Sequence, residues 1–516
     1  MNGANLLVKR AIAGGIEICF ANPGTTEAPL VVAFDETPGI KTILGLFEGV
    51  CTGAADGYGR MKGKPAMTLL HLGPGFANGI ANLHNARRAR TPIVNLIGEH
   101  ATWHRRADAP LAMDIEALAG TVSGWLRTNQ SVDTLSSNLT EAISASYYGQ
   151  ISSLIVPHDH QLADGEDTSA MMSEFSFDPP DTSIIEKTAA MLRRNSKSAI
   201  LLGGLALRGQ GLKYAGFIKA LTGCDLLTNS FPGRVDRGAD LPVVNRIPYF
   251  PEPAKALLSQ YEVVIYAGGT EPVTFFGYPG IDSYLLTHDQ ERIHLCSERQ
   301  DVVRSLEYLL DVLKGDKRSG NGNSMVRELR RPELLAGDLT PEKACITLAA
   351  LQPEGAIVVD EGLTTILPYY SLTAAIPYHT ILTIAGGAIG YGMPCATGAA
   401  LACPDRPVIT FQADGSALYT VQALWTQARE GLNVTTLICS NGSYNIVRIE
   451  LERAGIASRG PNAEALTDLG HPRIGWVKIA EGFGVPAVSV ETSEGLALEL
   501  VRALAEPGPH LIEMIL

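Results

Sequence analysis

The chain has 516 residues, of which 46% are hydrophobic and 18% are charged, and its formal net charge is −13. Such a length is enough for about three domains of ordinary size, and the composition is typical of a compact globular enzyme. The negative charge argues against nucleic acid and anionic membranes as partners, although backbone amides and a metal can still bind a phosphorylated ligand locally.

The eight cysteines and the N-terminal residues indicate where the protein works. No two cysteines form a CxxC pair and most lie in apolar runs, so we expect reduced, buried thiols in a cytoplasmic protein. The apolar run after Lys9 and Arg10 is interrupted by Gly14, Gly15 and Glu17, which makes it too short for a signal peptide or a membrane span. We therefore expect no membrane association.

Alternating apolar runs and helical patterns divide the chain into three α/β blocks. They cover residues 1–170, 183–318 and 338–516, with patternless polar stretches near 165–182 and 314–334 between them. Runs that indicate buried strands include IEICFANPG and AMTLLHLGPG in the first block, SAILLGGLAL in the second, and GAIVVDEG, PVITFQADG and VTTLICSNG in the third. The pattern predicts an α/β fold with three doubly wound parallel-sheet domains joined by two linkers.

The segment LFEGVCTGAADGYGR places Glu48 among the apolar residues Phe47, Val50 and Cys51. A carboxylate in such surroundings can exchange protons near neutral pH. Equally, a glutamate there can begin a helix, where the positive end of the helix dipole favours it. The residues alone leave both interpretations open.

Two further segments carry residues of a functional type that also have a plain structural interpretation. His71, in LLHLGPGFANGIANLHNA, can titrate near pH 7, or it can end its strand with a backbone hydrogen bond. In TIAGGAIGYGMPCATGAA, Gly386 and Gly387 permit a close backbone turn before the bulky Ile389. The same segment is equally typical of a strand that ends in a glycine-rich helix entry.

In the third block, Asp-Gly-Ser follows the strand RPVITF, and Asn-Gly-Ser follows the strand VTTLIC. Apolar residues at helix spacing from Leu418 to Ala428 predict one helix between them, so this is a strand–helix–strand unit. Ligands of such units bind beyond the carboxyl ends of the strands, where Asp414 and Asn441 are expected side by side. These oxygen ligands suit a hard divalent cation, to which a loop carbonyl near Ser443 could add a third.

The same loops suit a phosphate group. Gly415 lets the backbone approach a phosphate, and Ser416 begins the next helix, where amides point at an anion. Each loop taken alone is more readily a helix cap or a tight turn. Their combination at this spacing favours a site for a metal and a phosphate.

On these residues the chain resembles the thiamine diphosphate (ThDP) enzymes. The third block is similar to their diphosphate-binding domain, in which Gly-Asp-Gly after one strand is paired with Asn-Asn after a later one. Here Ala413 and Ser440 replace the first residue of each motif, while Asp414 and Asn441 keep the liganding positions. The resemblance implies that Asp414, Asn441 and the Ser443 carbonyl hold Mg²⁺, which in turn holds the diphosphate.

The first block resembles the pyrimidine-binding domain of the same superfamily, where a glutamate precedes Ala-Ala-Asp-Gly-Tyr-Gly-Arg. By this resemblance Glu48 bonds N1′ of the aminopyrimidine and favours the imino tautomer, which removes the thiazolium C2 proton. The Gly387 carbonyl would accept a hydrogen bond from the 4′-amino group, and Ile389 would hold the cofactor in its bent form. Glu361, in VDEGLTT, matches a position near the same site.

Two branches of the family match the chain. FANPGTTEAPL is similar to benzoylformate decarboxylases, which implies that Thr25 contacts the substrate carboxylate and that His71 is catalytic. The second catalytic histidine of that branch would fall in EPVTFFGYPG, which has Phe275, Phe276 and Gly277 instead. GPGFANGIANLHNARRARTPIVNLIGE and GYGMPCATGAA are similar to acetolactate synthases.

The middle block is short, and no convincing FAD site is found in it, although FPGRVDRGAD offers Arg234 and Arg237. No GxGxxG follows one of its strands, which also disfavours a dehydrogenase. We therefore expect a central domain of residues 183–318 without FAD, between a pyrimidine-binding domain of residues 1–170 and a diphosphate-binding domain of residues 338–516.

The resemblance implies a ThDP- and Mg²⁺-dependent enzyme that decarboxylates a 2-oxo acid. It then releases an aldehyde or ligates the bound enamine to a carbonyl acceptor, as a benzoylformate decarboxylase-like lyase. The alternative is an acetolactate synthase-like transferase acting on pyruvate, and a non-catalytic binding protein is disfavoured because Glu48 and Asp414 are intact. The resemblance also implies a homodimer or homotetramer with sites at the subunit interface, Glu48 and Asp414 of one site coming from different chains.

Overall fold

The computed structural model describes residues 1–167, 175–195, 197–315, 327–456 and 460–516. The chain forms two compact units. Residues 1–175, 332–370 and 384–516 make up the first unit, and residues 176–331 and 371–383 make up the second. Parts of both predicted linkers lie outside the described residues.

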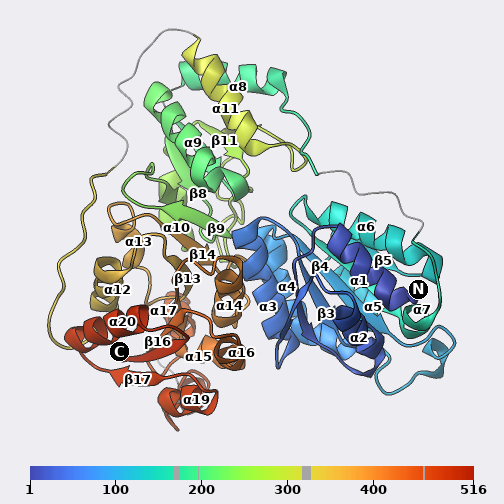
Figure 1. Ribbon diagram of the computed structural model, residues 1–516. Helices are drawn as coiled ribbons and strands as arrows, with labels where there is room; N and C mark the ends of the chain where they lie inside the picture. The colour runs from blue at the N-terminus through green and yellow to red at the C-terminus, as the bar shows by residue number, and fades with distance from the viewer. Residues whose placement is uncertain (168–174, 196, 316–326, 457–459) are drawn as a thin grey trace. The chain divides into compact units, whose positions relative to one another are not determined.

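A six-stranded parallel sheet forms the N-terminal part of the first unit. Its strands, in spatial order, are β2 (Lys41–Leu44), β1 (Ile18–Asn22), β3 (Ala66–Leu70), β4 (Ile93–Glu99), β6 (Ile151–Pro157) and β5 (Trp125–Thr128). Strands β3, β4 and β6 are buried at every position, as expected for strands covered by helices on both faces. Helices α1 (Gly3–Ala13) and α6 (Leu135–Ser146) cover one face, and α3 (Glu48–Lys62) and α4 (Leu72–Ala89) cover the other (Figure 1). The shorter helices are α2 (Ala28–Glu36), α5 (Ile115–Gly120) and α7 (His158–Leu162).

A second parallel sheet of the first unit is built from C-terminal residues. Its strands, in spatial order, are β17 (Ala487–Val490), β18 (His510–Ile515), β16 (Val434–Ser440), β15 (Val408–Ala413) and β13 (Ile357–Glu361). The helices of this part of the chain are α12 (Pro341–Leu351), α13 (Tyr369–Leu372), α14 (Gly392–Ala402), α15 (Asp414–Ala417), α16 (Ala423–Glu430), α17 (Asn445–Arg453), α18 (Pro461–Ala465), α19 (Trp476–Gly482) and α20 (Ser493–Ala505).

The second unit has its own five-stranded parallel sheet. Its strands, in spatial order, are β10 (Asn245–Arg246), β8 (Asp225–Thr228), β7 (Ser198–Leu202), β11 (Val263–Ala267) and β12 (Glu291–His294). Its helices are α8 (Thr182–Arg194), α9 (Gly209–Thr222), α10 (Pro251–Leu258) and α11 (Val302–Lys314). An antiparallel pair of this unit joins β9 (Arg234–Arg237) to β14 (His379–Thr383). Arg234 pairs with Asp236, and Arg237 donates to Thr373 and to the Val244 carbonyl, so both guanidinium groups are engaged within the unit.

The predicted α/β fold with three doubly wound parallel sheets is confirmed. Each sheet has a non-sequential strand order, as crossover connections through helices require. No helix within the described residues is long and apolar enough to cross a membrane. The bounds of the three predicted domains stay a prediction.

One predicted helix is wrong. The spacing from Leu418 to Ala428 predicts a single helix after Asp414, but α15 ends at Ala417 and α16 begins only at Ala423. The Thr420 hydroxyl between them donates to the Gly390 carbonyl at 2.9 Å. The segment between the two helices therefore contacts the glycine-rich loop instead of continuing the helix.

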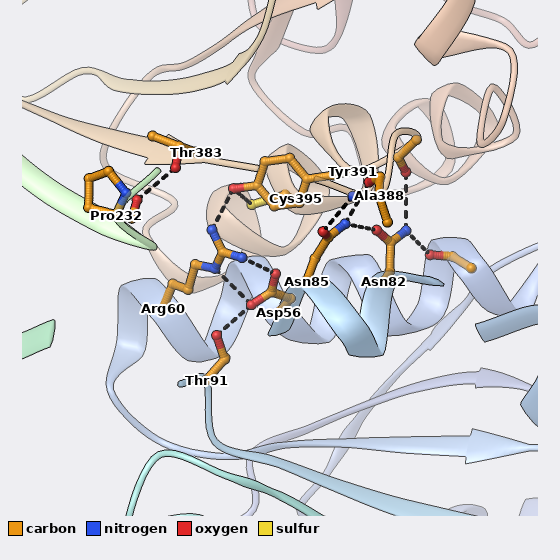
Figure 2. Close-up of polar contacts among 12 residues, drawn as sticks. Asp56, Arg60, Asn82, Asn85, Thr91, Pro232, Thr383, Ala388, Tyr391 and Cys395 are labelled. Carbon is orange, nitrogen blue, oxygen red and sulfur yellow. Dashed lines mark hydrogen bonds and ion pairs between the residues drawn. The ribbon is translucent and has the colours of Figure 1, made fainter. Parts of the chain in front are cut away.

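The two sheets of the first unit are joined where α3 crosses α14. A Cβ on Gly57 of α3 would lie 2.0 Å from the Cys395 carbonyl oxygen, and one on Gly398 of α14 would lie 1.8 Å from the Ala54 carbonyl oxygen. Only glycine allows this close approach of two backbones. A buried Asp56–Arg60 ion pair lies beside the crossing, where Arg60 also donates to the Tyr391 hydroxyl at 2.9 Å (Figure 2).

Candidate active site

Asp414 and Asn441 end neighbouring strands of the C-terminal sheet. Strands β15 and β16 pair in parallel with Ala413 opposite Cys439, so their following loops leave the sheet at the same edge. The Asp414 carboxylate accepts backbone N–H bonds from Gly415 and from Gly442, both at 2.8 Å. This carboxylate therefore ties the two loops together, as the strand–helix–strand pattern predicts.

The donors at this edge fit a divalent cation. Asp414 is only 3% exposed, and burial raises the pKa of its carboxyl group, although the N–H groups of Gly442 and Gly415 act in the opposite direction. Among the described residues no Lys, Arg or His side chain pairs with it. A buried carboxylate without a cation is costly, and a hard metal ion with oxygen ligands removes that cost.

The other donors at the site are neutral. Asn441 Oδ1 lies beside the loop and accepts the Ser443 N–H at 3.0 Å, so the amide oxygen and the Ser443 peptide are close to each other. Within the described residues no group of three or more His, Cys, Asp or Glu side chains could hold a metal. Asp414 and Asn441 thus offer one charged and one neutral oxygen donor, a combination that suits a metal that also binds phosphate and water. Binding of Mg²⁺ by these two side chains and the Ser443 carbonyl stays a prediction.

Space for a ligand lies beside these donors. A cavity of about 220 Å³ is lined by Asp414, Ser440, Asn441, Gly442, Leu469, Gly470, Arg473, Ile474, Ile515 and Leu516. Gly415 lies close to Tyr444, since a Cβ on Gly415 would be 2.5 Å from the tyrosine ring. The Ser416 hydroxyl donates to the Ala413 carbonyl and accepts from Gln412. Contact of Gly415 and Ser416 with a phosphate stays a prediction.

The glycine-rich loop before α14 turns sharply. Gly387 and Gly390 have φ angles of 75° and 91°, in the left-handed region that favours glycine. The loop packs on α4, because a Cβ on Gly386 would lie 2.7 Å from Asn85 Oδ1. Ile389 is half-buried beside it.

Glu361 supports this loop from behind. Its fully buried carboxylate accepts the backbone N–H groups of Gly390 at 2.7 Å, Tyr391 at 3.2 Å and Gly392 at 2.6 Å, and a side-chain N–H of Gln412 at 2.8 Å. Burial raises the pKa of this carboxyl group, and these hydrogen bonds counteract the shift. Since the protein already uses both oxygens, Glu361 is arranged to position the loop. A direct contact with a cofactor stays a prediction.

Glu48 and His71 lie close together beside the N-terminal sheet, at the starts of α3 and α4. Glu48 begins α3 and is 7% exposed, and its carboxylate accepts a side-chain N–H bond from Asn78 at 3.0 Å. Gly75 lies between Glu48 and His71, because a Cβ on it would be 2.8 Å from the Glu48 carboxylate and 3.2 Å from His71 Cβ. The structure thus brings two of the predicted catalytic side chains to the start of α4.

Glu27 is a functional candidate that the sequence analysis missed. It is fully buried at the end of a short 3-10 turn (Thr25–Glu27), and its carboxylate lies 2.7 Å from His71 Nδ1. Room for it comes from Gly98, where a Cβ would lie 1.5 Å from the Glu27 carboxylate. Glu27 can be found once β1 and β3 are known to be neighbours, because this pairing brings the residues after Asn22 next to the residues after Leu70.

The neighbouring threonines differ in position. Thr26, not Thr25, lies against His71, with its hydroxyl 3.3 Å from Nδ1 and 2.6 Å from Glu27 Oε1. Thr25 is exposed at the start of the turn. Its contact with a substrate carboxylate stays a prediction.

Comparison with known proteins decides the family. Residues 1–118 match the model of the thiamine pyrophosphate enzyme, N-terminal TPP binding domain. Residues 362–514 match the model of the thiamine pyrophosphate enzyme, C-terminal TPP binding domain. The chain belongs to the thiamine pyrophosphate enzyme family. Thiamine pyrophosphate is another name for ThDP, so the resemblance seen in the sequence is confirmed.

Relatives of this ThDP enzyme come from both branches. A Mycobacterium tuberculosis protein provisionally named acetolactate synthase large subunit IlvX is 47% identical, and the match covers 100% of this chain and 99% of the relative. A benzoylformate decarboxylase of Pseudomonas aeruginosa is 27% identical, with 97% and 96% covered. The solved structure of a ThDP-dependent 4-hydroxybenzoylformate decarboxylase from Rhodococcus jostii matches with a TM-score of 0.88 at 23% identity, covering 100% of this chain and 99% of that one. The fold is therefore that of ThDP enzymes, and the chain is a ThDP-dependent enzyme of the decarboxylase and acetolactate synthase group.

Proposed function

We propose that this ThDP enzyme also requires Mg²⁺, removes CO₂ from a 2-oxo acid, and then releases an aldehyde or joins the retained fragment to a carbonyl acceptor. The observation that carries the proposal is that Glu48 and His71 both lie next to Gly75 near the start of α4, where Glu27 bonds His71. A decarboxylase of this type needs general acid–base groups, and a carboxylate near an imidazole that is held in one orientation can supply them.

Residues of the C-terminal sheet would hold the cofactor. Asp414, Asn441 and the Ser443 carbonyl would bind Mg²⁺, which offsets the negative charge of the diphosphate. The backbones of Gly415 and Ser416 would lie against a phosphate. When bound, ThDP supplies the nucleophilic carbon and the electron sink of the reaction.

Two other groups would orient the aminopyrimidine ring. Glu48 would exchange a proton with its N1′ atom, and the Gly387 carbonyl would accept a hydrogen bond from its 4′-amino group. The apolar Ile389 would support the bent shape of the cofactor. These groups fix where a proton can enter or leave, which is the part of the chemistry that the protein controls.

His71 would act on the substrate side. Because its Nδ1 atom faces Glu27 at 2.7 Å, Nε2 is the ring nitrogen that remains to meet a substrate. Glu27 holds the ring in one orientation, as carboxylates do for histidines in many sites. Thr25 would contact the substrate carboxylate from the adjoining turn.

Replacing Glu27 with Gln is expected to lower kcat/KM by about 10- to 100-fold, because the ring of His71 loses the charged partner that orients it. The affinity for ThDP is expected to stay within about threefold of the unmodified protein. Steady-state kinetics and calorimetric titration measure the two quantities. Glu36→Gln, which alters an exposed carboxylate on α2, is the matched control and should change neither. Unchanged kcat/KM in the Glu27 variant would contradict this role.

An acetolactate synthase-like carboligase acting on pyruvate is the second candidate. It is favoured by the 47% identical relative and by Phe275, Phe276 and Gly277, which leave residues 271–280 without a histidine for proton delivery. In that reaction the acceptor is a second 2-oxo acid rather than a proton.

The experiment that tests the proposal is CO₂ release from a panel of 2-oxo acids with ThDP and Mg²⁺, followed by product analysis. A free aldehyde from an aryl or branched substrate supports the benzoylformate type. A 2-hydroxy-2-methyl-3-oxo acid formed from pyruvate supports the acetolactate type. No CO₂ from any member of the panel would overturn both.

We further propose a cytoplasmic homodimer or homotetramer in which Glu48 and Asp414 of one site come from different chains. Mixing and refolding the inactive variants Glu48→Gln and Asp414→Asn is then expected to restore part of the activity, because a mixed dimer has one intact site. Activity assays after mixing, with each variant alone as control, measure this. No recovery in a mixture shown to contain mixed dimers would place both residues of a site on one chain.

A further inference from the structure

Three asparagines lie on one face of α4. Asn78, Asn82 and Asn85 are spaced four and three residues apart, which places them in one line along the helix. We name them the asparagine row. Asn82 and Asn85 are buried and Asn78 is exposed. Asparagine is a weak helix former, so the two buried amides call for contacts that use them.

The asparagine row contacts α3 at one end and the glycine-rich loop at the other. Figure 2 shows Asn82 and Asn85 together with Ala388 of the loop. Asn78 donates to the Glu48 carboxylate at 3.0 Å. Asn82 donates to the carbonyls of Gly49 at 2.9 Å and Gly390 at 3.1 Å.

Asn85 makes two hydrogen bonds to the backbone of one loop residue, Ala388. Its side-chain N–H donates to the Ala388 carbonyl at 2.7 Å, and its Oδ1 accepts the Ala388 N–H at 3.1 Å. The same side chain also donates to Asn82 Oδ1 at 3.0 Å, which locks the two amides to each other. Among the described residues, the peptide groups of Ala388 have no other hydrogen-bond partner.

Burial makes these contacts strong constraints. Asn82 is 3% exposed and Asn85 is fully buried, so an unpaired amide or peptide group here would be costly. Gly386 lets the loop approach α4 closely, and His84 lies 3.2 Å from its carbonyl oxygen. The far side of the loop is held by Glu361 and Thr420 at Gly390, whereas the part around Ala388 depends on Asn85.

We infer that Asn82 and Asn85 are positioning residues, which hold the backbone of residues 386–390 so that the Gly387 carbonyl and the Ile389 side chain are fixed for the aminopyrimidine ring. Through Asn78 the same row also contacts Glu48 of its own chain, which in the proposed dimer belongs to the other site, so each α4 positions one group for each of two sites. The inference rests on the proposed function. It assigns to α4 a role in orienting the cofactor without touching it.

The test uses Asn85→Ala in the full-length protein. In the ligand-free protein, amide hydrogen–deuterium exchange in the 386–390 segment is expected to be roughly tenfold faster, because the Ala388 peptide loses both hydrogen bonds that Asn85 makes with it. With ThDP and Mg²⁺ added, cofactor affinity is expected to stay within about threefold, since the diphosphate end is unchanged. Exchange of the C2 proton of bound ThDP should slow by about 10- to 100-fold.

Asn95→Ala is the matched control. Asn95 is a fully buried asparagine of β4 that bonds Thr68 and Ser153 and does not contact the loop. It is expected to lower stability without changing either readout. If Asn85→Ala fails to fold, Asn85→Asp keeps the acceptor for the Ala388 N–H but loses the donor to its carbonyl, and the same slowing of C2 exchange is expected.

Two results would overturn the inference. Unchanged amide exchange at 386–390 in the Asn85 variant would refute the clamp itself. Faster amide exchange with unchanged C2 proton exchange would refute its role in orienting the cofactor. Failure of the proposed function looks different, because the unmodified protein would then show no catalysed C2 exchange or CO₂ release while the amide result still stands.

Discussion

Replacing Glu48 with Gln is expected to lower kcat by about 10²- to 10⁴-fold, the usual contribution of a positioned proton-transfer group. Glutamine has the same shape and can still accept the bond from Asn78, but it cannot exchange a proton with the aminopyrimidine. ThDP is expected to bind nearly as before, because the proposed diphosphate site lies on the other sheet. Turnover at saturating ThDP, together with calorimetric affinity, measures both effects.

The matched control for this variant is Glu17→Gln. Glu17 is a half-exposed carboxylate of the same part of the chain that bonds Lys64 and Tyr58. Its loss should leave kcat unchanged. A fully active Glu48→Gln protein would show that Glu48 takes no part in the chemistry and serves only as the first residue of α3.

Replacing Asp414 with Asn is expected to abolish Mg²⁺-dependent cofactor binding. The unmodified protein should be stabilised by ThDP with Mg²⁺, by about 2.7 kcal/mol when the ligand is at a hundredfold its Kd. The variant keeps the size of the side chain but loses the negative charge proposed to bind the metal, so this thermal shift should disappear. Because Asp414 is buried without a cation among the described residues, the ligand-free variant should be no less stable than the parent protein.

Asp468→Asn serves as its control. Asp468 lies in a neighbouring loop, where its carboxylate bonds the Gly470 N–H and His471. It is not one of the proposed metal ligands. Melting curves with ThDP alone, with Mg²⁺ alone and with both separate the metal-dependent part. A normal shift in the Asp414 variant would show that the metal is held elsewhere.

Much of the fold could be predicted because the strands are short, continuous apolar runs. Strands such as β4 and β16 are buried at every position, and such runs separated by helical patterns specify parallel sheets. The neighbourhood of Asp414 and Asn441 followed from the same logic, since residues after adjacent parallel strands meet at one edge. The helix after Asp414 was wrong because the apolar spacing does not show that Thr420 bonds Gly390.

What could not be predicted depends on contacts between distant parts of the chain. Glu27 reaches His71 only because β1 lies beside β3 and Gly98 leaves space for the carboxylate. The asparagine row has a visible helical spacing, but nothing in the sequence places α4 against residues 386–390. Glu361 was expected near the cofactor, whereas its partners, four N–H groups of the protein, emerge only from the folded loop.

The most direct measurement is a crystal structure of the protein grown with ThDP and MgCl₂. We expect a metal ion about 2.1 Å from oxygens of both Asp414 and Asn441, with the diphosphate bound to the same ion. Cofactor bound at a distance from these two side chains, or clear density for the diphosphate with Asp414 and Asn441 turned away from it, would contradict the account.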